Sequence, residues 1–169
     1  YDFLLITSYA QKITTGNLEL NFGINLKYLQ KYLAGKTAST ILSDVSSTYT
    51  LEFSSQKKIR FGICLHNLGG SLKFISQTYP VPVTIRIGAG YFTLFKRNKI
   101  VMALDVNFSN DDLPFLCAGM EYFFSRQIVF RVGLPEIRNN PTQLLGLGMG
   151  FYKNNWGIDY SCLFFDIFE

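Results

Sequence analysis

The stretch Asn17-Leu-Glu-Leu-Asn-Phe-Gly-Ile-Asn-Leu-Lys-Tyr28 alternates strictly between polar or small residues and apolar ones. A period of two places successive side chains on opposite faces of a β-strand, so the stretch predicts a strand with one apolar and one polar face. At ~3.3 Å per residue the strand is about 40 Å long. Tilted by ~45° it covers about 28 Å, close to the ~30 Å hydrocarbon thickness of a bilayer. The pattern therefore predicts a membrane-spanning β-strand.

Similar segments follow one another along the chain, about ten in all, and leave little room for helices. They cover residues 1–13, 17–32, 38–53, 57–66, 81–95, 98–108, 113–124, 127–133, 143–152 and 155–166. Short turns alternate with longer connections. The short turns are Thr14-Thr15-Gly16, Ser54 to Gln56, Lys96-Arg97, Ser125-Arg126 and Lys153-Asn154, and the longer connections are 33–37, 67–80, 109–112 and 134–142. This alternation is typical of outer-membrane β-barrels.

The composition agrees with a β-rich membrane protein. The 169 residues include 16 Phe and 10 Tyr, and only 17% are charged. Aromatic residues favour strands and membrane interfaces, and here many of them stand near the short turns. No window holds about 18 consecutive apolar residues, so we expect no transmembrane helix. The basic residues are dispersed and the net charge is only +4, so we expect no nucleic-acid partner.

Carrying the alternation through the other segments predicts one apolar and one polar face for the whole sheet. The sets expected to face outward are Ile59/Phe61/Ile63/Leu65, Val83/Ile85/Ile87/Ala89, Ile100/Met102/Leu104/Val106, Ile128/Phe130/Val132, Leu145/Leu147/Met149/Phe151 and Ile158/Tyr160/Cys162/Phe164. Ionisable residues alternate with them and need water or partners, so we expect them to line a lumen. The lumen-facing candidates are Arg60, His66, Arg86, Asp105, Glu121, Arg131 and Asp159.

The three arginines of this set allow two interpretations. They could line a path for an anionic head group such as a carboxylate, which arginine binds through two parallel hydrogen bonds. Alternatively they form internal pairs that neutralise the lumen, and we favour this because the two signs are nearly balanced. The acidic partners available are Asp44, Glu52, Asp105, Glu121 and Asp159.

The chain shows no recognisable catalytic or metal-binding pattern. His66 is the only histidine, and nothing in the sequence fixes a serine and an orienting group beside it. Cys64, Cys117 and Cys162 are far apart, so the sequence predicts neither a disulfide framework nor a zinc site. Alternation places Cys64 and Cys117 on the polar face and Cys162 on the apolar face. We expect no enzyme, no cofactor and no metal.

Six short runs carry a family resemblance. They are Gly23-Ile-Asn-Leu-Lys-Tyr28, His66-Asn-Leu-Gly-Gly70, Val81-Pro-Val-Thr-Ile-Arg-Ile-Gly-Ala-Gly90, Met102-Ala-Leu-Asp-Val106, Gly119-Met-Glu-Tyr122 and Gly157-Ile-Asp-Tyr160. Through them the chain resembles the PorV/PorQ and FadL-related outer-membrane barrels of diderm bacteria, including their spirochaetal relatives. The resemblance implies an all-β, antiparallel transmembrane barrel of FadL-like type, with about fourteen strands and an N-terminal plug. This chain would supply about ten strands as one domain, 1–169, incomplete at both ends.

The expected location is the bacterial outer membrane, in contact with its lipid. The first functional hypothesis is a passive transporter for hydrophobic small molecules such as long-chain fatty acids, which would diffuse through a plugged lumen. A second is a PorV-like scaffold of type IX protein secretion, whose outer loops would bind a protein partner. A third is a soluble lipid-binding β-barrel, which requires an apolar lumen and a polar exterior.

Overall fold

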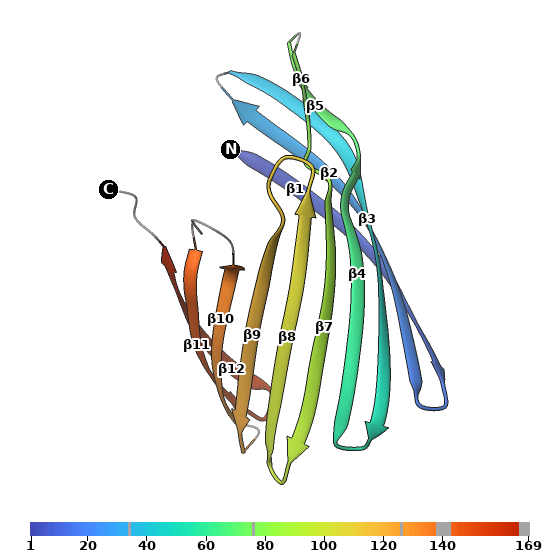
Figure 1. Ribbon diagram of the computed structural model, residues 1–169. Helices are drawn as coiled ribbons and strands as arrows, with labels where there is room; N and C mark the ends of the chain where they lie inside the picture. Colours follow the sequence, from blue (N-terminus) through green and yellow to red (C-terminus); the bar gives the residue numbers. More distant parts are fainter. Residues whose placement is uncertain (34, 76, 126, 138–142, 166–169) are drawn as a thin grey trace.

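The computed structural model describes residues 1–33, 35–75, 77–125, 127–137 and 143–165, and these form an all-β protein (Figure 1). Ten long strands form one antiparallel sheet, and two short strands form a separate hairpin. The prediction of an all-β chain with about ten antiparallel strands is confirmed. The strands are β1 (Asp2–Thr15), β2 (Leu18–Leu33), β3 (Lys36–Ser54), β4 (Lys57–Gly69), β5 (Ser71–Phe74), β6 (Gln77–Pro80), β7 (Thr84–Phe95), β8 (Asn98–Ser109), β9 (Phe115–Phe124), β10 (Ile128–Ile137), β11 (Gln143–Lys153) and β12 (Trp156–Phe165).

The large sheet is a meander in which consecutive strands pair, except that the β5–β6 hairpin intervenes in the chain between the paired strands β4 and β7. Its order is β1-β2-β3-β4-β7-β8-β9-β10-β11-β12, and it curves into a trough (Figure 1). The outermost strands, β1 and β12, each pair with a single neighbour. The described residues therefore form an open sheet, and barrel closure is not observed. The sequence predicts an incomplete barrel of about ten strands, of which the structure confirms the ten-stranded antiparallel sheet.

The short connections lie together at one end of the sheet, at the bottom of Figure 1. They join β1 to β2, β3 to β4, β7 to β8, β9 to β10 and β11 to β12. Four of these connections contain a residue with positive φ, as tight hairpins require. These residues are Gly16, Lys96, Ser125 and Asn154, with φ of 58°, 55°, 51° and 52°. The predicted separation of short and longer connections is thus present in the fold.

Several predicted boundaries differ from the structure. The connection 67–80, predicted as a loop, contains β5 and β6, which turn at Ile75 with a φ of 55°. β7 begins at Thr84 and not at 81, since Pro82 cannot donate a ladder hydrogen bond. β10 runs to Ile137, beyond its predicted end. Positions 34, 76, 126, 138–142 and 166–169 lie outside the described residues, and so do the parts of the predicted turns and strand ends that fall there.

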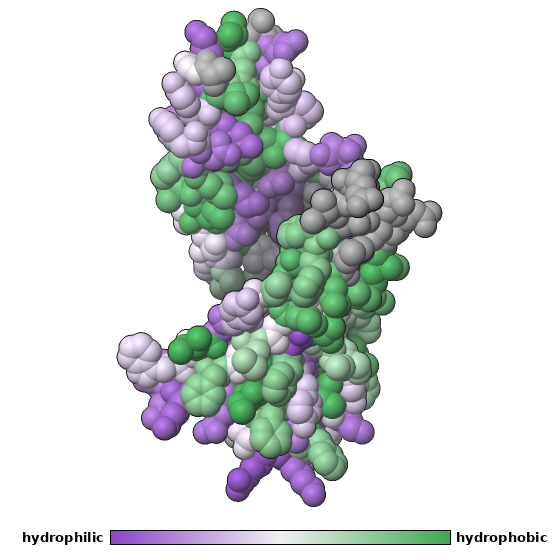
Figure 2. Space-filling view, turned by 90° about the vertical axis from the view of Figure 1, so that its left-hand side faces the viewer, coloured by the Kyte–Doolittle hydropathy of each residue, from purple (hydrophilic) through white to green (hydrophobic). Residues whose placement is uncertain are grey.

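The strand register places the residues predicted to face outward on one continuous convex face. For example, Ile63 pairs with Ile87, Ile87 with Val106 and Val106 with Leu116, across β4, β7, β8 and β9. Ile63 and Ile87 are 47% and 48% exposed. Figure 2 shows apolar side chains over much of the lower half of one flank, with hydrophilic ones at its lowest end.

The other face of the sheet is concave and polar. Its best-buried side chains include Thr50, Asn107 and Asp44, which are 1%, 2% and 3% exposed. Apolar Val129 and Leu42, at 0% and 3%, are buried beside them, but the large apolar side chains of the sheet mostly face outward. This distribution is the reverse of that in a soluble sheet, where the apolar face packs on a core.

Candidate functional site

The seven lumen-facing candidates all lie on the concave face, because each alternates with a residue of the convex apolar face. The structure divides them into three groups. Arg60, Arg86 and Asp105 line one cavity. Glu121, Arg131 and Asp159 form an ion-pair network. His66 belongs to a cluster around Asp44.

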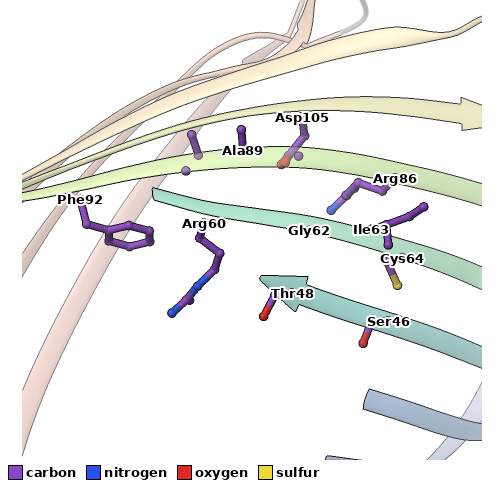
Figure 3. A pocket seen from close by; sticks show the side chains of 13 residues that line it. Ser46, Thr48, Arg60, Gly62, Ile63, Cys64, Arg86, Ala89, Phe92 and Asp105 are labelled. Atoms are coloured by element: carbon purple, nitrogen blue, oxygen red, sulfur yellow. The ribbon is translucent and has the colours of Figure 1, made fainter. Parts of the chain in front are cut away.

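The cavity has a volume of about 290 Å³ and lies over β3, β4, β7 and β8 (Figure 3). Its floor is glycine, since Gly62 pairs with Gly88 and Gly90 is the next residue of β7 on the same face. A Cβ added at Gly88 would lie 1.8 Å from Asp105 Oδ1. Glycine at this position therefore makes room for the Asp105 carboxylate and leaves the wall thin.

Two arginines define the chemistry of this cavity, which we call the arginine cavity. Figure 3 shows Arg60 and Arg86 on adjacent strands, projecting from the same side of the sheet as the hydroxyl groups of Ser46 and Thr48. Guanidinium and hydroxyl groups are hydrogen-bond donors, and guanidinium keeps its charge at any physiological pH. Asp105 contributes one carboxylate to the same cavity, so two cations face one anion and the remaining positive charge suits an anion such as a carboxylate.

Arg86 is held in place by neutral groups. Its Nε donates a hydrogen bond to Asn107 Oδ1 over 2.6 Å, and Asn107 Nδ2 in turn contacts Cys117 Sγ at 3.2 Å. The Cys117 thiol donates to the carbonyl oxygen of Pro135 over 2.9 Å. Among the described residues, Arg86 has no carboxylate within 4.0 Å. The expected acidic partner is missing because Cys64 and Asn107 occupy the opposing positions in the register.

Arg60 is only loosely neutralised. Its Nε donates to Thr50 Oγ1 over 3.0 Å, while Nη2 lies 4.0 Å from Glu19 Oε1. Its guanidinium carbon is 5.3 Å from the centroid of the Phe92 ring, a cation–π contact. Glu19 was not among the acidic partners expected from the sequence. Both arginines of the cavity thus retain donor capacity for a ligand.

A row of small residues leads from the arginine cavity across the concave face. Gly90 pairs with Ala103, Ala103 with Gly119, Gly119 with Gly133 and Gly133 with Gly146. At this level five neighbouring strands carry no side chain larger than a methyl group. A second cavity of about 260 Å³ lies over this row and shares Ala103 with the first. We call these five residues the small-residue row.

A buried polar cluster surrounds Asp44 on β3. Lys27 Nζ lies 2.7 Å from Asp44 Oδ1, and Asn25 Nδ2 donates to Oδ2 over 3.0 Å. The backbone N–H of Asn67 donates to Oδ1 over 2.9 Å, at a bulge where Asn67 has a φ of 60°. His66 Nδ1 is 3.6 Å from Oδ2. The cluster joins β2, β3 and β4, which makes His66 a structural residue.

The third group confirms an internal pairing expected from the sequence. Arg131 Nε donates to Glu121 over 2.9 Å and Nη1 to Asp159 over 2.5 Å. Tyr152, which the candidate set left out, contributes its hydroxyl oxygen 3.0 Å from Arg131 Nη2 and donates to Asp159 over 2.7 Å. The network spans β9 to β12. Arg131 is therefore saturated by protein groups, unlike Arg86.

Several residues of these groups lay outside the candidate set. Lys27, Asn107 and Tyr152 were recognisable as polar-face residues, because each alternates with apolar neighbours. Their roles depend on which residue lies opposite on the next strand, and a period of two does not specify that. Phe92 gave no signal, since an aromatic residue near a strand end fits either face.

Within the described residues, no three His, Cys, Asp or Glu side chains gather as a metal-binding group. None of these residues belongs to a helix long and apolar enough to cross a membrane. The sequence matches no model of a known protein family and no curated protein. Fold and site thus define an all-β protein whose open antiparallel sheet has an exposed apolar convex face and a polar concave face with cavities.

Proposed function

We propose that this chain forms part of an outer-membrane β-barrel, FadL-like in type, that passively conducts hydrophobic solutes. The observation that carries the proposal is the continuous convex face of exposed apolar side chains on ten long strands. A face of this size has to be covered, and bilayer lipid covers it along the whole sheet at once. Further strands would close the sheet, because a lipid-exposed edge cannot leave its N–H and C=O groups unpaired.

The concave face supports a path for the solute. The small-residue row leaves the wall thin at one level across β7 to β11, where larger side chains would fill the lumen. An alkyl chain lying along this row would contact backbone and methyl groups. The two cavities over the row share Ala103 and Asp105, which makes the path continuous with the arginine cavity.

The arginine cavity favours solutes that carry a carboxylate, with a long-chain fatty acid as the example. Arg86 is positioned by Asn107 and has no acidic partner among the described residues, so a ligand carboxylate would be its strongest available acceptor. Passage requires no covalent chemistry and therefore no catalytic residue. The plug segment implied by the family resemblance would regulate access.

A second candidate is a PorV-like scaffold that binds a protein partner of the type IX secretion pathway. The β5–β6 hairpin favours it, since the hairpin stands at the end opposite the short turns (Figure 1) and exposes Ile75 and Tyr79. The third hypothesis, a soluble lipid-binding barrel, has less support because the seven ionisable candidates lie on the concave face, whereas that hypothesis requires them on the exterior.

Uptake into vesicles tests the transporter directly. The full-length protein, reconstituted into liposomes, should admit a fluorescent long-chain fatty acid faster than empty liposomes do, and a neutral analogue less efficiently. Electrophoresis of boiled and unboiled samples should show the mobility shift of a folded barrel. Uptake no faster than in empty liposomes, from protein that shows the shift, would reject transport and leave the scaffold. A missing shift, with the protein in the soluble fraction, would reject the membrane barrel itself.

A further inference from the structure

The outer rim at the short-turn end carries basic residues and, in the part of the chain that the structure describes, no exposed acid. Lys57, Lys96, Arg97 and Lys153 lie in or beside the turns that join β3 to β4, β7 to β8 and β11 to β12, and all four are exposed. We call them the basic rim. None of the four forms an ion pair with another described residue, so their charges are available to a ligand.

The acids at this end are already occupied and face the concave side. Glu19 pairs with Lys12, and Glu52 with Lys58. Lys58 lies opposite Phe92 on the concave face and so does not belong to the rim. The electrostatic potential just outside the β3–β4, β7–β8 and β11–β12 turns is therefore positive, and a positive potential attracts anions.

Exposed aromatic side chains stand directly beside the cations of the rim. Lys96 Nζ lies 5.7 Å from the centroid of the Phe95 ring, and Trp156 is opposite Lys153 in the β11–β12 register. Phe95 and Trp156 are 66% and 84% exposed. Aromatic rings of this kind prefer the headgroup level of a bilayer, and cations just beyond them reach the phosphate level.

We propose that the basic rim binds the headgroups of anionic glycerophospholipids, such as phosphatidylglycerol, in the membrane leaflet at the short-turn end. Their acyl chains would lie on the convex apolar face above. The cations are spread over three separate turns, which matches lipids that carry one phosphate for two acyl chains. A lipid with two phosphates and many chains would need several cations converging on one point. This inference rests on the membrane location of the proposed function but not on transport.

The opposite end of the sheet lacks this pattern and provides a matched control. Its cations include Lys31, Lys36 and Lys73, and Lys31 lies 3.5 Å from Asp2. Asp111 and Asp112 stand at the same end, in the β8–β9 connection. Replacing three lysines at either end changes the net charge by the same amount, so only position distinguishes the two variants.

Lipid selectivity tests the proposal. The full-length protein is reconstituted into phosphatidylcholine bilayers that contain a trace of spin-labelled phosphatidylglycerol or spin-labelled phosphatidylcholine. Electron paramagnetic resonance then measures the motionally restricted fraction of each probe. We expect roughly a fivefold preference for phosphatidylglycerol at low salt, and its loss at about 1 M NaCl. The triple variant Lys57→Gln, Lys96→Gln, Lys153→Gln should lose the preference, while Lys31→Gln, Lys36→Gln, Lys73→Gln should keep it.

Three results would overturn the inference. One is a folded, inserted wild-type protein that restricts both probes equally. Another is an equal loss of preference in the two triple variants. A third is a rim variant that still restricts spin-labelled phosphatidylglycerol and releases it to purified lipid A as readily as the wild type does. The selectivity would then belong to another surface. If the protein fails to insert at all, the membrane location falls, and with it both this inference and the proposed transport.

Discussion

The carboxylate of Asp44 lies 2.7 Å from the ammonium group of Lys27, across β2 and β3, and the Asp44 residue is only 3% exposed. A charge this deeply buried requires a partner of opposite charge. Removing one member of the pair lowers the free energy of unfolding, because the other charge stays buried without compensation. The pair also holds the bulge at Asn67, because the backbone N–H of Asn67 donates to the same carboxylate. The pair therefore fixes the geometry of β2, β3 and β4 relative to one another.

Substituting Asp44→Asn should lower the free energy of unfolding by about 3 kcal/mol, since Lys27 would remain buried without its counter-ion. Urea unfolding of the reconstituted protein, followed by fluorescence, measures this. The control is Glu52→Gln, which breaks the exposed pair with Lys58 and should cost less than about 1 kcal/mol. Equal effects in the two variants would mean that the interior around Asp44 is fully hydrated.

The convex face can be tested by placing a charge on it at two heights. Leu104 lies midway along β8, and Phe95 lies at the short-turn end of β7. Leu104→Lys should destabilise the protein in a bilayer by about 2–4 kcal/mol, and Phe95→Lys by less than about 1 kcal/mol, because the cost of a charge falls toward the interface. Unfolding in lipid vesicles measures both. A cost independent of height would argue that water covers this face.

The path along the concave face predicts a contrast between two neighbouring residues. Gly119 belongs to the small-residue row, and a Cβ there would meet only the carbonyl oxygen of Val132, at 3.7 Å. Ala118 faces the convex side, opposite Leu104 and Leu134. Gly119→Phe should reduce fatty-acid uptake several-fold without loss of the electrophoretic mobility shift, while Ala118→Phe should leave uptake unchanged. Equal uptake in both variants would place the path elsewhere.

Arg86 should govern the preference for a charged solute. Arg86→Gln removes the guanidinium that has no acidic partner among the described residues, so uptake of a long-chain carboxylate should fall to the level of its neutral analogue. The control Lys99→Gln removes a cation of the same face that already stacks on Phe123 at 4.5 Å. A preference that survives in Arg86→Gln would exclude the arginine cavity as the carboxylate site.

The strands and their faces follow from the sequence because a period of two is a local property. Residues 17–28 show this, and β2 lies where the alternation predicts it. The β5–β6 hairpin did not show in the pattern, since its four-residue strands are too short to alternate visibly. Closure was also beyond local reasoning, because it depends on whether β1 and β12 meet, which no single strand encodes.

The candidate site was also only partly predictable from the sequence. Membership of the polar face was predictable for all seven residues, but the partners were not. Arg131 pairs with two of the expected acids, Glu121 and Asp159, whereas Arg86 lies opposite Asn107 because the register of β7 and β8 aligns them. Register depends on turn lengths and bulges, such as the shift between Ser43 and Val45, and these act over many residues.

The most direct test of the central claim compares the two faces at one place in the sheet. Ala103 lies on the concave face and Leu104 on the convex face of β8. In a background where Cys64, Cys117 and Cys162 are replaced by serine, Ala103→Cys and Leu104→Cys are exposed separately, in vesicles, to a charged, membrane-impermeant maleimide. We predict labelling at 103 and none at 104, with both positions labelled after unfolding. Labelling at 104 and protection at 103 would contradict it, because the apolar face would then meet water and the polar face would be enclosed.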